Sequence, residues 1–539
     1  MIKELFVDYY KNAIVNNWNL PALQDYDNKE SVITFGKLGN NILRLHKLFK
    51  DCGIKENDKI VLVGKNSVNW GCVYLAATTY GAVIVPLLQD FTPKDIYALT
   101  NHSDARLAFV SEYILNKMDV SNFTIVEEIF KLDNFDSYYT RNGEQHTFDR
   151  NMQEITAKDF TLPNLPNDKL GVILYTSGTS GSPKGVMLTL NALAANIKFA
   201  RENMFLVSGD KLVSFLPLAH CYGCAFDFLY PLTEGCHIIF LGKLPSPQVI
   251  LKAFGEYKPR LILSVPLILE KIYKGKIKPT LEKPAVKFMT KVPGLRSIIY
   301  RKIRKTLEDA FGGNFIELIL GGAKVNREVE TFLKKIGFRF TVGYGMTECG
   351  PLVAYSGWKT NPMYAAGKLV DCLEAKVESS APGKIGEILL RGENIMCGYY
   401  KNPEETARAL DSEGWLHTGD LGIIDKDGFI SLKGRSKTMI LTSSGQNVYP
   451  EEIESRLCNF PLVSECVVVS RAAKIVSIIY PNPDLTKGMS PEQIETELAE
   501  YQKQINSEMP AYMQINKIQV RDQEFEKTPK KSIKRYLYE

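Results

Sequence analysis

The stretch LGVILYTSGTSGSPKGV, from Leu170 to Val186, decides the fold of this chain. Its apolar first half has the length and composition of a buried strand, and its second half is a loop rich in glycine, serine and threonine. Glycines let such a loop turn tightly, while backbone amides, hydroxyls and a lysine can bind a polyphosphate. The candidate phosphate-binding residues are Thr176, Ser177, Gly178, Thr179, Ser180, Gly181 and Lys184.

The loop differs from the G-x-x-x-x-G-K-[ST] loop of many nucleoside triphosphatases, in which glycine and lysine are adjacent. Here Ser182 and Pro183 stand between Gly181 and Lys184. A strand that leads directly into the loop also disfavours a plain surface linker. We therefore expect a polyphosphate site of another kind.

Apolar strand-like runs alternate with helical stretches over the first part of the chain, which is typical of parallel sheets covered by helices. One set of runs starts at residues 59, 81, 107 and 170, and a second set starts at residues 212, 237, 261 and 317. We expect an α/β fold in which these runs form two helix-covered, mostly parallel sheets. Between about 343 and 433, short strands separated by glycines indicate antiparallel pairs or a small distorted β-barrel.

With 539 residues the chain is too long for a single hydrophobic core, so we expect at least two domains. After residue 434 the sequence predicts helices at 451–457 and 491–509 and strands at 466–470 and 474–480. That pattern indicates a small α+β domain of about 100 residues. We predict a large domain over 1–434 and a small one over 435–539.

The composition, with 45% hydrophobic and 24% charged residues, is that of a globular protein. The first residues mix charges with apolar side chains, unlike a signal peptide, and no apolar run reaches the ~18 to 20 residues of a membrane span. The cysteines are scattered without a disulfide framework, so we expect reduced thiols and a cytoplasmic location. A formal net charge of +5 is too small to indicate nucleic acid as a partner.

Positive charge gathers over residues 271–305, where Glu282 is the only acidic residue. Tyr273, Phe288 and Tyr300 lie among the lysines and arginines. Such a stretch can be a surface for anionic lipid headgroups or for a phosphorylated ligand, or simply a set of solvated helix faces. Peripheral contact with the inner face of the membrane is one expectation, and the sequence does not indicate an oligomeric state.

Five further motifs follow the polyphosphate loop: LPLAH (216–220), GGA (321–323), VGYGMTE (342–348), GWLHTGDLG (414–422) and GRSKTMI (434–440). In this order the motifs resemble those of the acyl-adenylate-forming (AMP-binding) enzymes, and the resemblance covers nearly the whole chain. Within that superfamily the chain is most similar to bacterial long-chain fatty acid–CoA ligases. The resemblance implies ATP, Mg²⁺ and coenzyme A as cofactors and co-substrates.

The resemblance also implies roles for residues of the large domain. Tyr344 would stack on the adenine, Gly345 would be a further nucleotide-binding residue, and Thr347 would hydrogen-bond the α-phosphate. Glu348 would bind Mg²⁺, for which carboxylate oxygens are suitable ligands, with Thr176 as a second metal-binding residue. The residues expected beside the acyl group are His220, which would flank its carboxylate, and Gly321, Gly322 and Ala323, which would line the adenine and acyl pockets.

Further roles fall near the start of the small domain. Asp420 would accept hydrogen bonds from the ribose hydroxyls, and Arg435 would contact the ribose or a phosphate. In the family the small domain is a lid that rotates about a hinge to bring in the thiol of coenzyme A, and this hinge falls at Lys437. Gly445 matches the loop that borders the pantetheine path.

The C-terminal end departs from the family pattern P-K-T-x-x-G-K-I, whose last lysine neutralises the carboxylate and the α-phosphate. In EKTPKKSIKR, residues 526–535, Ser532 stands where that lysine belongs. Lysine side chains are long and flexible, so we expect Lys531, or alternatively Lys530, to supply the charge.

Together these features predict an AMP-forming acid–thiol ligase. It would activate a carboxylic acid, expected to be a medium- to long-chain fatty acid, as its acyl-adenylate and transfer it to coenzyme A. Cys221 stands where amino-acid-activating relatives have an aspartate, which disfavours an amino acid substrate. Two alternatives stay open: an acyl-AMP ligase that loads a carrier protein, and a catalytically silent homologue that binds nucleotide or acyl groups.

Overall fold

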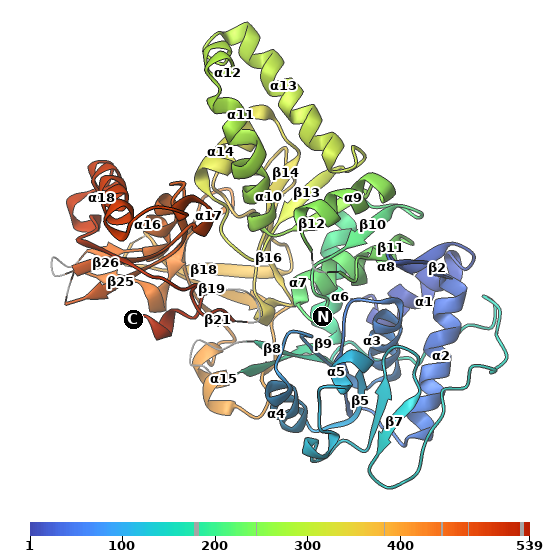
Figure 1. Cartoon of the computed structure of the whole chain (residues 1–539). Helices are drawn as coiled ribbons and strands as arrows, with labels where there is room; N and C mark the ends of the chain where they lie inside the picture. The colour runs from blue at the N-terminus through green and yellow to red at the C-terminus, as the bar shows by residue number, and fades with distance from the viewer. Residues whose placement is uncertain (177–182, 244, 382, 443–445, 473, 529–532) are drawn as a thin grey trace. The chain divides into compact units, whose positions relative to one another are not determined.

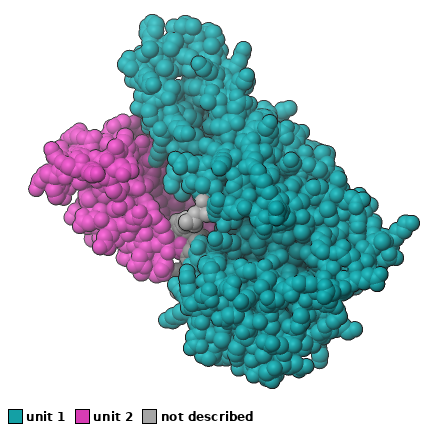
Figure 2. Space-filling model, turned by 45° about the vertical axis from the view of Figure 1, so that its right-hand side comes forward, with its two compact units in different colours: residues 1–325, 329–374, 391–416 teal, residues 326–328, 375–390, 417–539 magenta. Residues whose placement is uncertain are grey.

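The computed structural model describes residues 1–176, 183–243, 245–381, 383–442, 446–472, 474–528 and 533–539. The chain divides into two compact units, which Figure 2 draws in different colours. Unit 1 comprises residues 1–325, 329–374 and 391–416, and unit 2 comprises residues 326–328, 375–390 and 417–539. The predicted boundary between residues 434 and 435 stays a proposal, because a hinge and the edge of a compact unit need not coincide.

The largest sheet in the described residues of unit 1 contains β3 (Lys59–Val63), β4 (Val83–Leu87), β5 (Ala105–Val110), β6 (Glu128–Lys131), β7 (Ser137–Thr140), β8 (Leu170–Thr176), β9 (Lys184–Thr189) and β20 (Gly398–Tyr399). Their order across the sheet is β20-β9-β8-β4-β3-β5-β6-β7 (Figure 1). The central strands are parallel, and β7, β9 and β20 add antiparallel pairings at the two sides. The predicted parallel sheet is confirmed.

Strands of this sheet are apolar along their length because helices cover its faces. Helices α4 (Pro93–Ser103) and α5 (Glu112–Leu115) place Ile96 and Leu115 against Val85 and its neighbours in one buried cluster. The buried strands hold the chain rigidly where β8 ends, so the loop that follows starts from a fixed point.

The second set of predicted strands pairs in two sheets of unit 1. β10 (Lys211–Ser214) and β11 (His237–Phe240) are parallel, and β11 continues to β1 (Pro21–Asp25) and β2 (Asn28–Thr34). β12 (Leu261–Ser264), β13 (Glu317–Leu320) and β14 (Phe340–Val342) form a separate parallel sheet. The α/β class is confirmed, while the expected pairing of the second set in a single sheet is replaced by this division.

The glycine-rich region consists of short strands, as predicted. β15 (Tyr344–Gly345), β16 (Leu352–Tyr355) and β17 (Lys368–Leu369) pair antiparallel in unit 1. β18 (Leu373–Glu378), β19 (Gly386–Gly392), β21 (Leu416–Ile424) and β22 (Ile430–Arg435) follow one another across a further sheet, which lies mostly in unit 2. β21 and β22 are antiparallel, with Asp420 opposite Arg435.

The rest of unit 2 is the predicted α+β domain. β25 (Val463–Arg471) and β26 (Lys474–Pro481) are antiparallel, and β27 (Lys517–Val520) is parallel to β26. Helices α16 (Pro450–Leu457) and α18 (Pro491–Ser507) share a buried cluster with this sheet through Ile453, Leu498 and Ile479. The separate core explains why these residues group as a compact unit.

Other long helices of unit 1 pack against its strands or against one another. They include α1 (Phe6–Asn16), α2 (Phe35–Asp51), α3 (Val68–Tyr80), α6 (Leu190–Asn203) and α9 (Pro247–Tyr257). In the described part of the chain, no helix is both long enough and apolar enough to cross a bilayer.

Candidate active site

The candidate site starts at the β8–β9 hairpin of unit 1. Thr176, the last residue of β8, pairs with Lys184, the first residue of β9. The loop between them contains Ser177, Gly178, Thr179, Ser180 and Gly181, and these predicted phosphate-binding residues lie outside the described residues. The two ends of the loop are therefore held side by side by strand pairing.

Lys184 has a carboxylate and an aromatic ring as neighbours. Its ammonium group forms an ion pair with Glu405, which lies on α15 (Pro403–Ala409). The same ammonium lies 5.0 Å from the centre of the Tyr399 ring, within the range of a cation–π contact. Glu405 also pairs with Arg408, and hydrogen bonding to Lys184 is the main factor that lowers the pKa of its carboxyl group. A phosphate that binds here can thus replace Glu405 as the ion-pair partner of Lys184, because Arg408 still neutralises Glu405.

Tyr399 connects this cation to the predicted metal ligand. The phenol of Tyr399 donates a hydrogen bond of 2.9 Å to Oε1 of Glu348. Burial is the main cause that raises the pKa of Tyr399, followed by the charge of Glu348, so the phenol stays protonated as a donor. Glu348 itself lies in the short 3₁₀-helix η4 (Thr347–Cys349), and its backbone carbonyl accepts from the amide of Met396 at 2.8 Å.

Sequence reasoning missed Tyr399 and Glu405. They occur in GYYKNPEET, which carries no spacing that indicates a site. Tyr399 and Glu405 lie at the candidate site because β20 pairs with β9. In this pairing Tyr399 is opposite Val186 and Gly398 is opposite Met187. A pairing between residues so far apart in sequence leaves no local pattern from which it could have been predicted.

Tyr344, Gly345 and Thr347 lie in β15 and η4 of unit 1, next to Glu348. The side chain of Tyr344 is buried in this structure, whereas Gly345 is exposed. A side chain at 345 would place its Cβ 2.4 Å from the carbonyl oxygen of Pro351, so only glycine fits there. Thr347 Oγ1 accepts a weak hydrogen bond of 3.6 Å from the thiol of Cys221.

This contact connects Thr347 with the segment that contains His220. His220 directly precedes α7 (Cys221–Gly223), and its backbone carbonyl accepts from the amide of Cys224 at 2.9 Å. The phenol of Tyr222 donates to the carbonyl oxygen of Ile319 at 3.1 Å, which fixes the ring over the end of β13. His220 and Cys221 are both partly exposed, so a ligand can approach this segment.

Gly321, Gly322 and Ala323 follow β13 directly. A Cβ on Gly321 would lie 2.9 Å from the Tyr222 ring, so the absent side chain makes room for that ring. Gly322 has a φ of +81°, in the left-handed region that glycine adopts without strain. Gly322 and Ala323 are exposed, and the structure thus brings the GGA motif and the His220 segment together through Tyr222.

The aromatic residues that follow Tyr222 belong to the protein core and, in the described part of the chain, line no open cavity for an acyl chain. Phe226, Phe228 and Tyr230 are each at most 1% exposed. Phe228 makes edge-on contacts with Trp70 and Tyr74 in the protein core. These side chains stabilise the fold, and a ligand could reach them only if the core repacked.

The remaining predicted residues belong to unit 2. Arg435 Nε lies 2.8 Å from Oδ1 of Asp420, and Asp420 is buried. The backbone amide of Asp420 donates to Thr418 Oγ1 at 3.0 Å. Lys437 lies in the 3₁₀-helix η5 (Ser436–Thr438), directly after Arg435. Gly445, Lys530, Lys531 and Ser532 lie outside the described residues.

The arrangement in unit 1 suits a magnesium-bound polyphosphate. Glu348 and Thr176 carry hard oxygen atoms, and Tyr399 donates a hydrogen bond to one oxygen of Glu348, which leaves lone pairs for a cation. Lys184 supplies positive charge at the root of the loop. The donor set therefore fits Mg²⁺, and no soft ligand is needed.

Two family models match this chain. A model described as AMP-binding enzyme matches residues 11–400, and a model described as AMP-binding enzyme C-terminal domain matches residues 437–539. The first match covers well over half of the chain. The chain belongs to the AMP-binding enzymes.

This AMP-binding enzyme has several curated relatives. It is 27% identical to a long-chain-fatty-acid–CoA ligase of Mycobacterium bovis, over 82% of this chain and 76% of the relative. It is 25% identical to a chloroplastic long-chain-fatty-acid–[acyl-carrier-protein] ligase of Arabidopsis thaliana, over 90% of this chain and 77% of the relative. Both names describe ligases that act on long-chain fatty acids.

Solved structures resemble this AMP-binding enzyme over its whole length. The o-succinylbenzoate CoA synthetase of Bacillus subtilis, in complex with its acyl-adenylate intermediate, gives a TM-score of 0.78 at 19% identity and covers 100% of this chain and 99% of that one. An anthranilate CoA ligase gives a TM-score of 0.77 at 19% identity, over 99% and 96%. These likenesses confirm the fold, and the family matches confirm the superfamily predicted from the order of the motifs.

Proposed function

We propose that this AMP-binding enzyme uses ATP and Mg²⁺ to activate a medium- to long-chain fatty acid as its acyl-adenylate and then transfers the acyl group to coenzyme A. In the first step a carboxylate oxygen attacks the α-phosphorus and pyrophosphate leaves. In the second step the thiol sulfur attacks the acyl carbonyl carbon, AMP leaves, and the thiol proton passes to solvent. The products are acyl-CoA, AMP and pyrophosphate.

The observation that carries this proposal is the cluster of Lys184, Tyr399 and Glu348 at the root of the glycine-rich loop. Two anions must approach each other in the first step, so the site has to offset their repulsion. Lys184 supplies a cation that exchanges Glu405 for a phosphate, and Tyr399 holds Glu348 in place. Mg²⁺ bound by Glu348 and Thr176 would supply further charge neutralisation.

Residues of both units take part in the proposed reaction. Thr347 hydrogen-bonds the α-phosphate, and His220 flanks the acyl carboxylate. Tyr344, Gly345 and the 321–323 segment receive the adenine and the adjoining part of the acyl group. In unit 2, Asp420 and Arg435 exchange their mutual ion pair for contacts with the ribose and a phosphate.

Two observations favour a fatty acid as the substrate: the names of the relatives, and Cys221, which disfavours an amino acid. Curated relatives include long-chain-fatty-acid ligases and a fatty acyl-CoA synthetase of Dictyostelium discoideum that is 28% identical over 80% of this chain. A cysteine at 221 gives an ammonium group no counter-charge. Each buried methylene would add about 0.8 kcal/mol of binding free energy, so a chain-length preference can be steep.

A second candidate function is an acyl-AMP ligase that loads a carrier protein. The Arabidopsis relative whose name specifies an acyl-carrier-protein acceptor is the observation that favours it. Both functions share the adenylation step and differ only in the thiol that receives the acyl group.

The deciding experiment measures AMP release with ATP and Mg²⁺ over a ladder of acids from acetate to oleate. Each acid is tested alone, with coenzyme A, and with a phosphopantetheinylated acyl carrier protein. A maximum at long chains that requires coenzyme A is the expected result. Turnover only with the carrier protein would support the second candidate, and tight ATP binding without AMP from any acid would reveal a catalytically silent homologue.

Lys531 is the proposed substitute for the lysine that is missing at Ser532. We expect Lys531→Ala to lower acid-dependent ATP–pyrophosphate exchange by about a hundredfold, because one charge that contacts the transferring phosphoryl group contributes about 3 kcal/mol. Lys530→Ala is the matched control and should keep exchange within a few-fold of wild type. Unchanged exchange in Lys531→Ala, with loss in Lys530→Ala, would transfer the role to Lys530.

A further inference from the structure

A basic helical hairpin stands between β12 and β13 of unit 1. It consists of α11 (Lys278–Glu282), α12 (Pro284–Met289) and α13 (Pro293–Ala310), which project from the sheets of unit 1 in Figure 1. Residues 271–305 hold twelve lysines and arginines and one glutamate. This segment contributes +11 to a chain whose formal net charge is +5, so the rest of the chain is net acidic by 6 charges.

Large apolar side chains are exposed at the corner between α12 and α13. Phe288 is 69% exposed and Ile298 is 63% exposed, and Val292 and Leu295 are at least 40% exposed. Phe288 lies in the last turn of α12, Val292 directly precedes α13, and Leu295 and Ile298 are three positions apart at the start of α13, so all four lie at the corner or next to it. Burial in the protein core does not account for them.

Cations border this apolar surface. Helical spacing puts Leu295 and Ile298 on the same face of α13 as Lys302 and Lys305, which are both exposed. The face is therefore apolar toward the corner and cationic toward the sheets. Lysines with long apolar stems can reach the headgroups from such a position while the apolar residues enter the bilayer.

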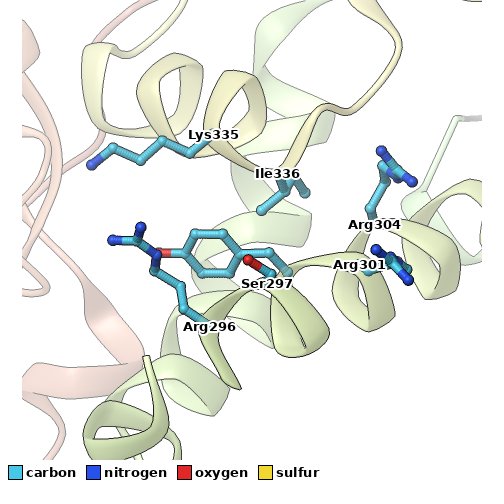
Figure 3. A pocket seen from close by; sticks show the side chains of 7 residues that line it. Arg296, Ser297, Arg301, Arg304, Lys335 and Ile336 are labelled. Atoms are coloured by element: carbon cyan, nitrogen blue, oxygen red, sulfur yellow. The ribbon is translucent and has the colours of Figure 1, made fainter. Parts of the chain in front are cut away.

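The opposite face of α13 is cationic as well. It borders a hollow of about 580 Å³ lined by Arg296, Ser297, Tyr300, Arg301, Arg304, Lys335 and Ile336. Figure 3 shows the nitrogen ends of Arg296 and Lys335 at one end of this hollow and those of Arg301 and Arg304 at the other. Within the described residues, these four cations form no ion pair closer than 4.0 Å. The charges of these four side chains are thus not neutralised by a described carboxylate in contact with them.

We propose that the α12–α13 corner docks on the anionic surface of a lipid bilayer, with Phe288, Val292, Leu295 and Ile298 inserted and the surrounding lysines and arginines at the headgroup phosphates. Charge complementarity favours this partner, since each cation near an anionic bilayer raises the partition coefficient about fivefold. The exposed apolar corner favours a bilayer over nucleic acid, whose surface offers phosphates but no apolar interior. The proposal does not depend on which acid the enzyme activates.

Co-sedimentation of the full chain with vesicles tests the proposal. We expect binding to vesicles of an equal mixture of phosphatidylcholine and phosphatidylglycerol, little binding to phosphatidylcholine alone, and weaker binding at high salt because salt screens the charges. Absence of binding to the mixed vesicles at low salt would overturn the proposal. Equal binding to both kinds of vesicle would overturn the electrostatic part and with it the choice of partner.

Paired variants locate the surface. Phe288→Ser with Ile298→Ser should lower the partition coefficient about tenfold or more, because two inserted side chains are lost. Phe205→Ser with Val207→Ser is the matched control, since these residues are 72% and 63% exposed elsewhere in unit 1. An equal loss of vesicle binding in both pairs of variants, or no loss in the first pair, would contradict the proposal that the α12–α13 corner enters the bilayer.

A charge series provides an independent test if the apolar variants are unstable. Lys287→Glu with Lys302→Glu should lower binding to the mixed vesicles about tenfold or more. Lys94→Glu with Lys158→Glu makes the same change in net charge at exposed sites outside the hairpin and should have a much smaller effect. Equal effects would show that net charge, and not the hairpin, drives binding. A dimer, or a complex with duplex DNA, that is lost only in the hairpin variants while vesicles are not bound would assign the corner to that partner instead.

Discussion

Tyr399 is the residue on which the geometry of the candidate site depends most, because it contacts both Lys184 and Glu348. The variant Tyr399→Phe keeps the aromatic ring beside Lys184 but lacks the hydroxyl that donates a hydrogen bond to the Glu348 carboxylate. Hydrogen bonds to charged groups contribute about 1.5 to 3 kcal/mol, so we expect kcat/KM for ATP to fall about tenfold to a hundredfold. Steady-state kinetics at varied Mg²⁺ should show that more Mg²⁺ partly restores activity.

Tyr400→Phe is the matched control for this prediction. The phenol of Tyr400 donates to Asp104 Oδ2 at 2.7 Å and not to Glu348. The two variants lose the same group from adjacent residues. Similar kinetics in both variants would contradict a positioning role for Tyr399.

The side-chain carboxyl group of Glu317 in β13 has a raised pKa. Burial raises its pKa to about 7, although the Tyr355 phenol and the Trp358 amide donate hydrogen bonds to it. The folded state then binds more protons than the unfolded state between pH 4.5 and 7. The contribution of Glu317 to the free energy of unfolding should fall by about 3 kcal/mol as pH rises through this window.

Glu317→Gln removes this titration and keeps an oxygen acceptor. We expect the stability of wild type relative to the variant to decrease from pH 4.5 to pH 8, measured as the urea midpoint of tryptophan fluorescence. All four tryptophans of the chain lie in unit 1, so the signal reports on the unit that contains Glu317. Glu202→Gln, at an exposed site, should give a pH profile parallel to wild type, and a parallel profile for Glu317→Gln would refute the prediction.

At the scale of elements, helix α15 holds Glu405 beside Lys184. The side chain of Asn402 caps this helix by accepting a hydrogen bond of 3.1 Å from the amide of Glu405. Asn402→Ala removes a cap that is typically worth about 1 kcal/mol. Hydrogen exchange of the first amides of α15 should become about fivefold faster, and KM for ATP should change because Glu405 is less firmly placed.

Asn402→Asp keeps an acceptor at the cap and is the control for the helix. It should restore slow exchange in α15. If Asn402→Ala leaves both exchange and KM unchanged, the cap does not determine the position of Glu405.

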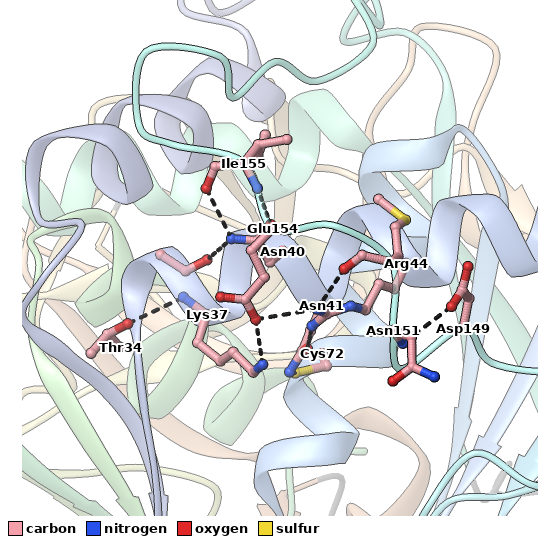
Figure 4. A network of polar contacts seen from close by, with 12 residues as sticks. Thr34, Lys37, Asn40, Asn41, Arg44, Cys72, Asp149, Asn151, Glu154 and Ile155 are labelled. Carbon is pink, nitrogen blue, oxygen red and sulfur yellow. Dashed lines mark hydrogen bonds and ion pairs between the residues drawn. The ribbon is translucent and has the colours of Figure 1, made fainter.

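Another element-level feature lies between α2 and the segment that precedes β8. Arg44 of α2 is 5% exposed and donates to Glu154 Oε1 at 3.1 Å, and Lys37 donates to the same oxygen at 2.5 Å (Figure 4). Asn40 Oδ1 accepts from the amide of Ile155 at 2.9 Å. A long segment with little regular structure is thus attached to a helix by charged and polar side chains, which no periodic pattern in the sequence indicates.

At the scale of the whole molecule, the proposed mechanism needs the two half-reactions to use different faces of the small domain. Lys437→Pro fixes φ at the proposed hinge and removes a backbone donor. We expect ATP–pyrophosphate exchange to stay within a few-fold of wild type and acyl-CoA formation to fall about a hundredfold, because only the second step requires the rotation.

Lys437→Ala distinguishes backbone freedom from the side chain. It should support both half-reactions. Equal loss of exchange and of acyl-CoA formation in Lys437→Pro would place the hinge elsewhere or show that the variant is misfolded, which its circular dichroism spectrum would reveal.

The sequence by itself determined the class of the fold, the order of the motifs and the superfamily. A buried strand is recognisable in the sequence as an apolar run, and the strand 170–176 before the glycine-rich loop is an example. Helix α18 is recognisable by its start, a serine cap followed by proline. Such signals are local, because they depend on periodicity, on turn residues and on capping within a few positions. Motif order added the expected chemistry of Glu348, Asp420 and Lys184.

Only the tertiary structure decided which distant elements meet. It brought Tyr399 and Glu405 to Lys184 through the pairing of β20 with β9, divided the second set of strands between two sheets, and buried Phe226 and Phe228 in the core. The free energy that selects these pairings is a sum of burial and strand pairing over the whole chain, while the cost of closing a loop changes little with its length. Local sequence therefore specifies each strand and helix, but not its neighbours.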